Sequence, residues 1–233
     1  MKTVIFDFDG TLHLCPTAWK AIWQKLGYST YADSEFVKLF NAFMEGEVSH
    51  KEWCDLTAKA FRKKSLKKDV VDKIGANTIL LKNVDTALKY LKENGYKVYI
   101  LSGGIREVIQ IALGDAAQYV DGIMASDLIY DKKGIFKSIQ GTNYDYAGKA
   151  NFVKEYIKTT NSDPEDITFV GDGDNDEWVH SSGCNTICIN PKKHTDHENR
   201  EKWHQVLFTE DFVDVLPLIE NANHNKTEEE SYI

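Results

Sequence analysis

Two aspartates separated by one residue, Asp7 and Asp9, directly follow an apolar run at the start of the chain. The run at residues 4–6 (VIF) has the β-branched and aromatic residues of a buried strand, and Gly10 and Thr11 then turn the chain. Alternate residues of a strand share a face, so both carboxylates can reach one point in space. Carboxylates that meet repel each other, and such a site requires a hard cation or a shared proton. A strand that simply ends in a turn would also explain the Asp-Gly pair.

Three further polar signals lie at the ends of predicted elements later in the chain. The segment Ser102-Gly103-Gly104 follows one apolar strand, and residues 171–176 (GDGDND) follow another. Lys149 lies near the start of a predicted helix between them. Each alone has an ordinary explanation, namely a loop, an acidic turn or a solvated charge. The carboxyl ends of the strands meet at one rim of a doubly wound parallel sheet, so we expect these signals to converge there with Asp7 and Asp9.

Composition and charge restrict the classes of function. The chain has 233 residues, which suits one domain or one core with a modest insertion. Its formal net charge of −8 argues against a nucleic-acid partner, which needs a basic surface. No apolar stretch approaches the length of a membrane span, and two aspartates interrupt the N-terminal apolar run, so we expect neither a membrane span nor a signal peptide. The spacing of the four cysteines fits no zinc site or disulfide framework, which is typical of reduced thiols in a cytoplasmic protein.

Hydrophobic periodicity predicts how the chain is organised. Apolar residues recur at helical spacing between residues 14 and 77, which indicates a small helical bundle inserted after the first strand. From residue 83 onward strands and helices alternate, as in a parallel sheet covered on both faces. Ser49 and Asn83 are predicted helix N-caps, and residues 127–139 are predicted to form a hairpin. The other strands are predicted over residues 96–101, 120–125, 167–170, 186–189 and 206–208, and the helices behind them over 84–94, 105–112, 146–159, 177–182 and 211–219.

The predicted fold class is therefore α/β, a doubly wound parallel sheet with a small helical cap. We expect a core made of residues 1–13 and 78–220, with a cap over residues 14–77. Residues 221–233 are polar and rich in Glu, a composition typical of a disordered tail.

Taken in this order, the four signals resemble the haloacid dehalogenase superfamily of phosphatases, and the likeness covers most of the chain. The D-x-D-G-T motif at residues 7–11 and the G-D-G-x-N-D motif at residues 171–176 are specific signatures. Ser102-Gly103-Gly104 and the segment Met44-Glu45-Gly46 are most similar to the phosphoserine-phosphatase-like branch. The resemblance implies a Rossmann-like core with a cap inserted after the first strand.

The resemblance also implies roles for individual residues. Asp7 would be the nucleophile that forms an aspartyl-phosphate, and Asp9 the general acid and then the general base. Mg²⁺ would be held by Asp7, the Asp9 backbone carbonyl and Asp172, with Asp176 binding the metal or its water. Phosphate or substrate would be bound by Gly10, Thr11, Ser102, Gly103, Lys149 and Asn175.

Two departures from phosphoserine phosphatases bear on the substrate. That branch has an acidic residue soon after the first motif, which binds the substrate amine, but residues 13–18 contain none. It also has a cap arginine about a dozen residues beyond Met-Glu-Gly, where this chain has none near Thr57, and Arg62 is out of register. The resemblance therefore implies a phosphoryl site and a small phosphorylated metabolite without specifying serine.

Three functions remain open from the sequence. The first is a Mg²⁺-dependent phosphomonoesterase. The second is a phosphotransferase that uses the same residues to pass the phosphoryl group to an alcohol. The third is a non-catalytic binding protein on the same fold.

The aromatic residues of the predicted cap allow two interpretations. Trp and Phe recur there at core spacing, which favours a packed helical core, but an aromatic cage for a quaternary ammonium group is the alternative. Trp53, Leu56 and Ala60 are expected on the inner face of the third helix. His194, His197 and His204 fit no usual zinc pattern.

Overall fold

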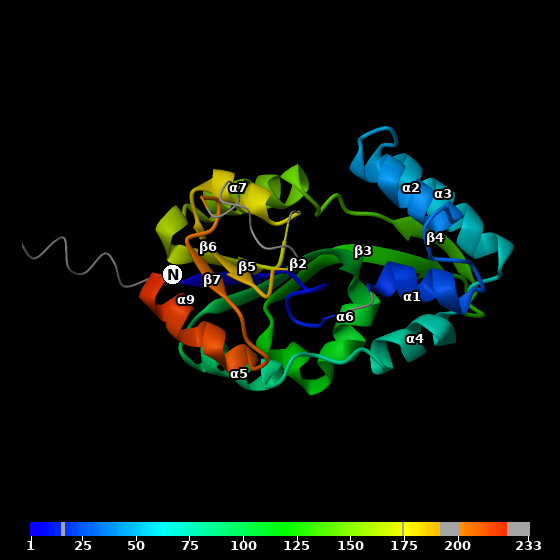
Figure 1. Cartoon of the computed structure of the whole chain (residues 1–233). Helices are drawn as coiled ribbons and strands as arrows, with labels where there is room; N and C mark the ends of the chain where they lie inside the picture. The colour runs from blue at the N-terminus through cyan, green and yellow to red at the C-terminus, as the bar shows by residue number, and fades with distance from the viewer. Residues whose placement is uncertain (15–16, 174, 192–200, 223–233) are drawn as a thin grey trace, which may run out of the picture.

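The computed structural model describes residues 1–14, 17–173, 175–191 and 201–222. Within these residues one seven-stranded sheet has the order β4-β3-β2-β1-β5-β6-β7. This sheet forms the middle layer of the molecule (Figure 1). Its strands are β1 (Thr3–Phe6), β2 (Lys97–Ile105), β3 (Gly122–Tyr130), β4 (Phe136–Gln140), β5 (Ile167–Gly171), β6 (Asn185–Ile189) and β7 (Gln205–Leu207).

The first strand lies at the centre of this sheet. β1 pairs in parallel with β2 on one side and with β5 on the other, so that Phe6 lies beside Ile100 and Val170. The pairs β2–β3, β5–β6 and β6–β7 are also parallel, and only the β3–β4 hairpin is antiparallel among the described strands. Parallel pairing brings the carboxyl ends of β1, β2 and β5 to one edge.

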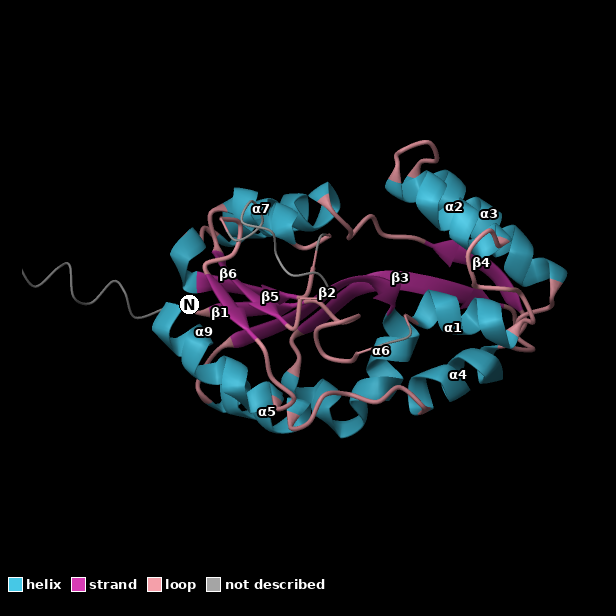
Figure 2. Ribbon diagram, in the orientation of Figure 1, coloured by secondary structure: helices cyan, strands magenta, loops and turns pink. Residues whose placement is uncertain are grey.

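Helices cover both faces of the sheet, as Figure 2 shows. α5 (Val84–Glu93), α6 (Arg106–Leu113) and α9 (Leu216–Ala222) lie on one face, and α7 (Ala147–Thr160) lies on the other. The alternation of β1 explains this, because its side chains point to opposite faces in turn. Val4 and Phe6 join one buried cluster with the side chains of α5, whereas Ile5 joins another with Val153 of α7. The predicted α/β fold class is confirmed.

Four helices lie between β1 and α5 in the sequence and gather at one end of the molecule. Hydroxyl side chains accept backbone N–H groups at three of their N-termini, and Ser49 completes the predicted cap of α3 as a capping box. The β3–β4 hairpin extends between α2 and α3 on one side and α1 and α4 on the other. Phe61 of α3 and Phe136 of β4 pack with ring centroids 5.6 Å apart. The four helices are α1 (Ala18–Lys25), α2 (Glu35–Met44), α3 (His50–Lys63) and α4 (Lys68–Ala76).

Several predicted details are wrong. The strand expected to end at residue 101 continues to Ile105, with a shift in register between Leu101 and Ile105. The helices expected over 177–182 and 211–219 contain 3-10 turns: η3 covers Glu177–Ser182, and η4 (Phe212–Val215) precedes α9. The other 3-10 helices are η1 (Gly114–Tyr119) and η2 (Pro164–Asp166).

Two side-chain predictions are also wrong. Leu56 was expected on the inner face of α3 but is 46% exposed, whereas Cys54 and Thr57 are buried there. Asn83 precedes α5, yet it has a left-handed backbone and makes no capping bond. Its side-chain amide donates to Asp211 instead, because a partner distant in the sequence competes for the same group.

Some predictions fall partly outside the described residues. Helix α9 continues to Ala222, beyond the expected start of the tail, and residues 223–233 are not described. His194 and His197 are likewise outside the described residues. The division into core and cap stays a prediction. Cys54, Cys184 and Cys188 are buried.

None of the described helices combines the length and the apolar character that crossing a bilayer would require.

The packing of α3 generates a test with a matched pair of variants. Phe61 is fully buried against Trp19, Trp23 and Phe136, so we expect Phe61→Ala to lower the free energy of unfolding by about 3–5 kcal/mol. Leu56→Ala, on the same helix, removes a half-exposed side chain and should cost at most about 1 kcal/mol. Urea unfolding monitored by circular dichroism measures both. Equal losses would contradict the assignment of the buried face.

Candidate active site

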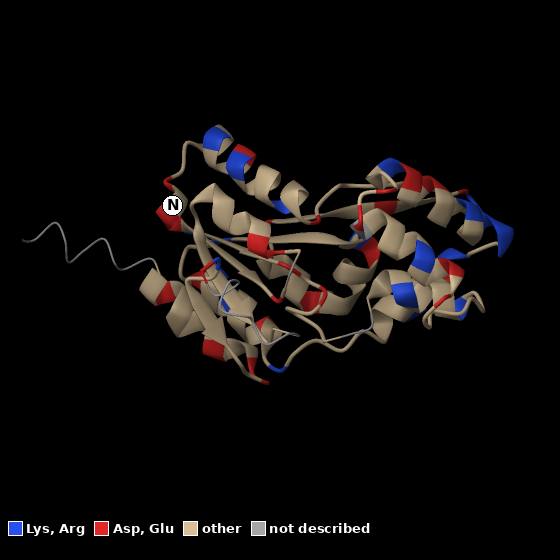
Figure 3. Cartoon of the chain, turned by 45° about the horizontal axis from the view of Figure 1, so that its top comes forward, with Lys and Arg blue, Asp and Glu red and all other residues tan. Residues whose placement is uncertain are grey.

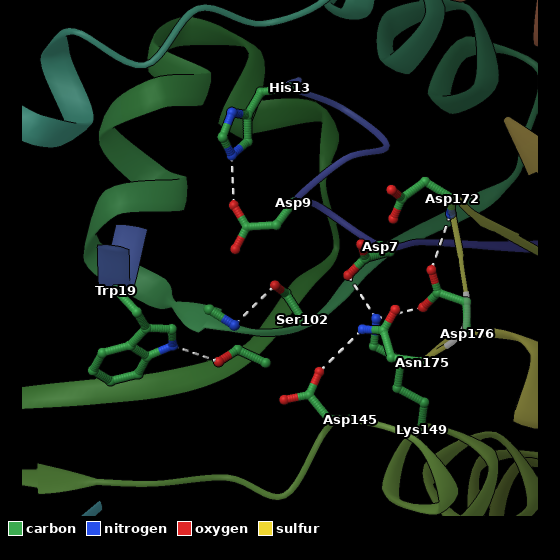
Figure 4. Close-up of polar contacts among 12 residues, drawn as sticks. Asp7, Asp9, His13, Trp19, Ser102, Asp145, Lys149, Asp172, Asn175 and Asp176 are labelled. Carbon is green, nitrogen blue, oxygen red and sulfur yellow. Dashed lines mark hydrogen bonds and ion pairs between the residues drawn. The ribbon is translucent and has the colours of Figure 1, made fainter. Parts of the chain in front are cut away.

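The predicted polar signals meet at the carboxyl edge of the central strands. Asp7 directly follows β1, Asp172 directly follows β5, and Ser102 lies in the last part of β2. Figure 4 shows their side chains gathered around one space, with Lys149 entering from the start of α7. The convergence follows from the parallel pairing of β1 with both neighbours.

Three carboxylates and one ammonium group are buried together at this edge. Asp7, Asp172 and Asp176 are at most 3% exposed, and they offer oxygen atoms within 4.8 Å of one another. The Nζ atom of Lys149 lies 2.7 Å from Oδ1 of Asp7 and 2.5 Å from Oδ1 of Asp176. The other Asp176 oxygen accepts the backbone N–H of Asp172 at 3.0 Å. These contacts hold the carboxylates in one cluster.

This cluster fits a hard divalent cation. One ammonium group cannot balance the charge of three buried carboxylates, and uncompensated buried charge is costly. Within the described part of the chain, Oδ2 of Asp7 is buried and has no hydrogen-bond partner. Gly10 leaves the necessary room, because a Cβ atom there would overlap the carboxylate of Asp172. Oxygen donors in this arrangement are the ligands that hard cations prefer.

Burial and neighbouring charges shift the titration of the cluster. Burial, partly offset by Lys149 and reinforced by Asp172, raises the pKa of Asp7 to about 7. Burial, again partly offset by Lys149, raises the pKa of Asp176 to about 6. Burial also opposes the charged form of Lys149, but Asp176 and Asp7 outweigh it and raise the pKa of this ammonium group. The ammonium group of Lys149 therefore keeps its charge at neutral pH, whereas the charges of Asp7 and Asp176 change with pH.

Asp9 lies on the cavity side of Asp7 and has a partner that the sequence interpretation missed. Nε2 of His13 lies 2.5 Å from Oδ1 of Asp9, and the His13 ring packs on Phe8 with centroids 4.9 Å apart. The turn at residues 10–12 brings this imidazole back to the carboxylate (Figure 4). The only sequence signal was a histidine four residues after Asp9.

Only some of the predicted phosphate-binding residues are in the described lining of the cavity. Ser102, Gly103 and Asn175 line the cavity above the carboxylates. Ser102 Oγ accepts the backbone N–H of Gly104 at 3.0 Å. Gly10 and Thr11 are buried and do not belong to the described lining.

A cavity of about 480 Å³ extends from these carboxylates to α1, α2 and α3. Trp19 of α1 reaches the last part of β2, where its indole Nε1 donates to the carbonyl of Gly103 at 2.9 Å. Asp145, which the sequence interpretation did not select, lines the cavity and accepts the side-chain amide of Asn175 at 3.1 Å. Its signal in the sequence was a carboxylate four residues before Lys149.

Comparisons with known proteins agree with this arrangement. The family model for a haloacid dehalogenase-like hydrolase matches residues 1–178. A phosphoserine phosphatase from Archaeoglobus fulgidus is 27% identical over 195 residues, which cover 82% of this chain and 53% of the relative. The chain thus spans about half the length of that relative. A phosphoserine phosphatase from Methanocaldococcus jannaschii is 25% identical over 177 residues, covering 75% of this chain and 79% of the relative.

Solved structures of similar fold include a substrate-bound phosphoserine phosphatase complex, with a TM-score of 0.68 and 22% identity. The match covers 93% of this chain and 97% of that one. A HAD family hydrolase from Salmonella enterica serovar Typhi has a TM-score of 0.73 and 22% identity, covering 94% and 71% of the two chains. At these identities the likeness concerns the fold.

The raised pKa of Asp7 generates a prediction about metal affinity. Below the pKa of about 7, Asp7 holds a proton that a bound cation must displace. We therefore expect the affinity for Mg²⁺ to fall as the pH falls from 7 to 5, by about tenfold per pH unit for each proton released. Calorimetric titration in two buffers of different ionisation enthalpy measures affinity and proton release together. An affinity that is constant over this range would contradict the prediction.

Gly10 provides a second test of the metal site. Gly10→Ala combines a strained φ of 99° with overlap on the Asp172 carboxylate, so we expect lower stability, by about 1–2 kcal/mol from the backbone alone, and weaker metal binding. Gly27→Ala is the matched control, because its φ is 79° and no described atom lies within 4 Å of the added Cβ. Thermal unfolding and calorimetric metal titration separate the effects. Unchanged metal affinity in Gly10→Ala would contradict the role of this glycine.

Proposed function

The chain belongs to the haloacid dehalogenase-like hydrolase family, and on this premise we propose that it is a Mg²⁺-dependent phosphatase acting on a small phosphorylated metabolite. The observation that carries the proposal is the buried cluster in which Lys149 pairs with Asp7 and Asp176 beside Asp172. We also propose that residues 14–77 act as a cap over the site. The names of the phosphoserine phosphatase relatives support a phosphate ester as substrate.

Asp7 is the proposed nucleophile. One oxygen is held by the Lys149 ammonium at 2.7 Å, and the other is buried without a hydrogen-bond partner among the described residues. A carboxylate oxygen attacks phosphorus, the ester P–O bond breaks, and its electron pair leaves with the alkoxide. Lys149 stabilises the charge that gathers on the phosphoryl group and keeps the Asp7 carboxylate oriented.

Asp9 is the proposed acid and base. Its carboxylate lines the same cavity as Ser102, within reach of the proposed leaving alcohol. It gives a proton to the leaving alkoxide and then takes one from the water that attacks the aspartyl-phosphate. This second attack breaks the bond between phosphorus and the Asp7 oxygen and releases phosphate. His13 positions Asp9 through the 2.5 Å contact.

Asp7, Asp172 and the backbone carbonyl of Asp9 would hold Mg²⁺, with Asp176 binding the ion or orienting its water. When bound, this ion would withdraw charge from the phosphoryl oxygens. The hydroxyl of Ser102 and the backbone N–H of Gly103, which line the same cavity, would donate hydrogen bonds to these oxygens.

The nucleophile assignment is tested by an isosteric change. We expect Asp7→Asn to lower kcat on p-nitrophenyl phosphate with Mg²⁺ by on the order of 10³-fold or more, because the amide cannot form the covalent intermediate. Asp55→Asn, an exposed position on α3, should leave kcat unchanged. Released phosphate and alkyl phosphate products are measured with and without added alcohols, which separates hydrolysis from phosphotransfer. Retained turnover in Asp7→Asn would refute the assignment.

A further inference from the structure

The part of the cavity lining that comes from α1, α2 and α3 is rich in aromatic residues. Trp19 and Trp53 pack edge to face with centroids 4.9 Å apart, and Phe43 lies 5.8 Å from Trp53. Phe40 remains 41% exposed although it is a large apolar side chain. The face of an aromatic ring is apolar and carries partial negative charge. The aromatic residues of the cap that line the cavity are Trp19, Phe36, Phe40, Phe43 and Trp53, with the imidazole of His50 among them.

Other aromatic residues of the cap form its core. Trp23 and Phe61 are at most 1% exposed and do not belong to the described lining. The interpretation of a packed helical core therefore holds for Trp23 and Phe61, whereas the aromatic residues named above line the cavity. The exposed ring surface of Phe40 is not used in the packing of the helices, so a ligand in the cavity can contact it.

A carboxylate stands between the aromatic wall and the phosphoryl site. Asp145 packs against the backbone of Gly103, since a Cβ atom on that glycine would overlap the Asp145 carboxylate. It accepts a hydrogen bond from the neutral amide of Asn175 and forms no salt bridge among the described residues. Glu177, the other acid on this side, is paired with Lys202 at 2.7 Å. Asp145 is thus a carboxylate that lines the cavity, and its charge acts on Lys149, which is itself paired with Asp7 and Asp176.

Positive charge is scarce around this part of the cavity. Lys20 is the one lysine or arginine in the described lining, and it belongs to α1. Figure 3 shows most lysines and arginines on the helices, whereas acidic residues lie both on the helices and around the middle of the molecule. An alcohol that carried a carboxylate would meet Asp145 beside the phosphoryl site, and like charges repel.

We propose that the site selects phosphate monoesters whose alcohol carries a quaternary ammonium group close to the ester oxygen. The ammonium group would lie between Asp145 and the aromatic faces of the cap, while the phosphoryl group occupies the site beside Asp7. The inference rests on the proposed phosphatase function and adds the class of alcohol. Trimethylammonium groups suit such a wall because each methyl carries part of the charge and packs on a ring face.

A pair of substrates with one atom exchanged tests this inference. Phosphocholine and 3,3-dimethylbutyl phosphate have the same shape, but the second has carbon in place of the charged nitrogen. We expect kcat/KM for phosphocholine to be at least about tenfold higher, since cation–π contacts with desolvated rings and a facing carboxylate together exceed one factor of ten. O-phosphoserine should be hydrolysed less efficiently than phosphocholine. Equal values for the isosteric pair, or a preference for O-phosphoserine, would overturn the proposal.

Variants identify the groups responsible. Asp145→Asn should reduce the phosphocholine to dimethylbutyl phosphate ratio of kcat/KM about tenfold, mainly through KM, and Phe40→Leu should reduce it less. Asp55→Asn, on the exposed side of α3, should leave the ratio as in the wild type. Because the ratio compares two substrates on one protein, a general loss of activity cancels. A ratio that survives in both Asp145→Asn and Phe40→Leu would refute the assignment of the subsite.

A binding measurement keeps this inference separate from the proposed catalysis. Calorimetry of both esters with Asp7→Asn in the presence of Mg²⁺ needs no turnover. Tighter binding of phosphocholine, with no hydrolysis of any ester including p-nitrophenyl phosphate by the wild type, would support the subsite and refute the phosphatase. Equal binding of the two esters, with turnover of p-nitrophenyl phosphate by the wild type, would refute the subsite and support the phosphatase.

Discussion

A buried ammonium group surrounded by carboxylates is the interaction on which the site depends. Lys149 is fully buried, and taking its charge out of water costs several kcal/mol unless partners compensate. Asp7 and Asp176 provide that compensation at 2.7 and 2.5 Å, but they introduce more negative charge than one ammonium can balance. This excess of negative charge is the physical reason why the cluster suits a divalent cation. The contacts of Lys149 also require that the end of β1, the start of α7 and the segment after β5 lie close together.

The sheet makes that meeting possible, and the cap is tied to it. β1 lies between β2 and β5, so residues that follow three strands share one edge. The indole of Trp19 donates to the carbonyl of Gly103, which joins α1 of the proposed cap to the segment proposed to bind phosphate. The β3–β4 hairpin lies between α2/α3 and α1/α4 and contacts α3 through Phe136. The aromatic residues of α1–α3 and the carboxylate cluster therefore line the same cavity.

Much of the fold could be predicted because its signals are local. The apolar run before Asp7, the Ser49 capping box and the turn at the β3–β4 hairpin each lie within a few residues, so neighbouring side chains determine them. Predictions failed where distant partners decide. The strand β2 continues through Ser102-Gly103-Gly104 because β3 pairs with Ile105, and Asn83 turns toward Asp211. Leu56 is exposed because the neighbours that bury Cys54 and Thr57 come from other elements.

The sequence by itself determined the chemistry available to this protein: paired aspartates after a strand, a second acidic motif, a lysine at a helix start and the order that indicates the family. These depend on residue type and spacing, which the chain carries directly. Only the tertiary structure decided that His13 contacts Asp9, that Asp145 stands beside Gly103, and which aromatic residues of the cap face the cavity. The reason is that a helix has several faces, and the packing of the whole cap against the sheet selects the one that remains beside the site.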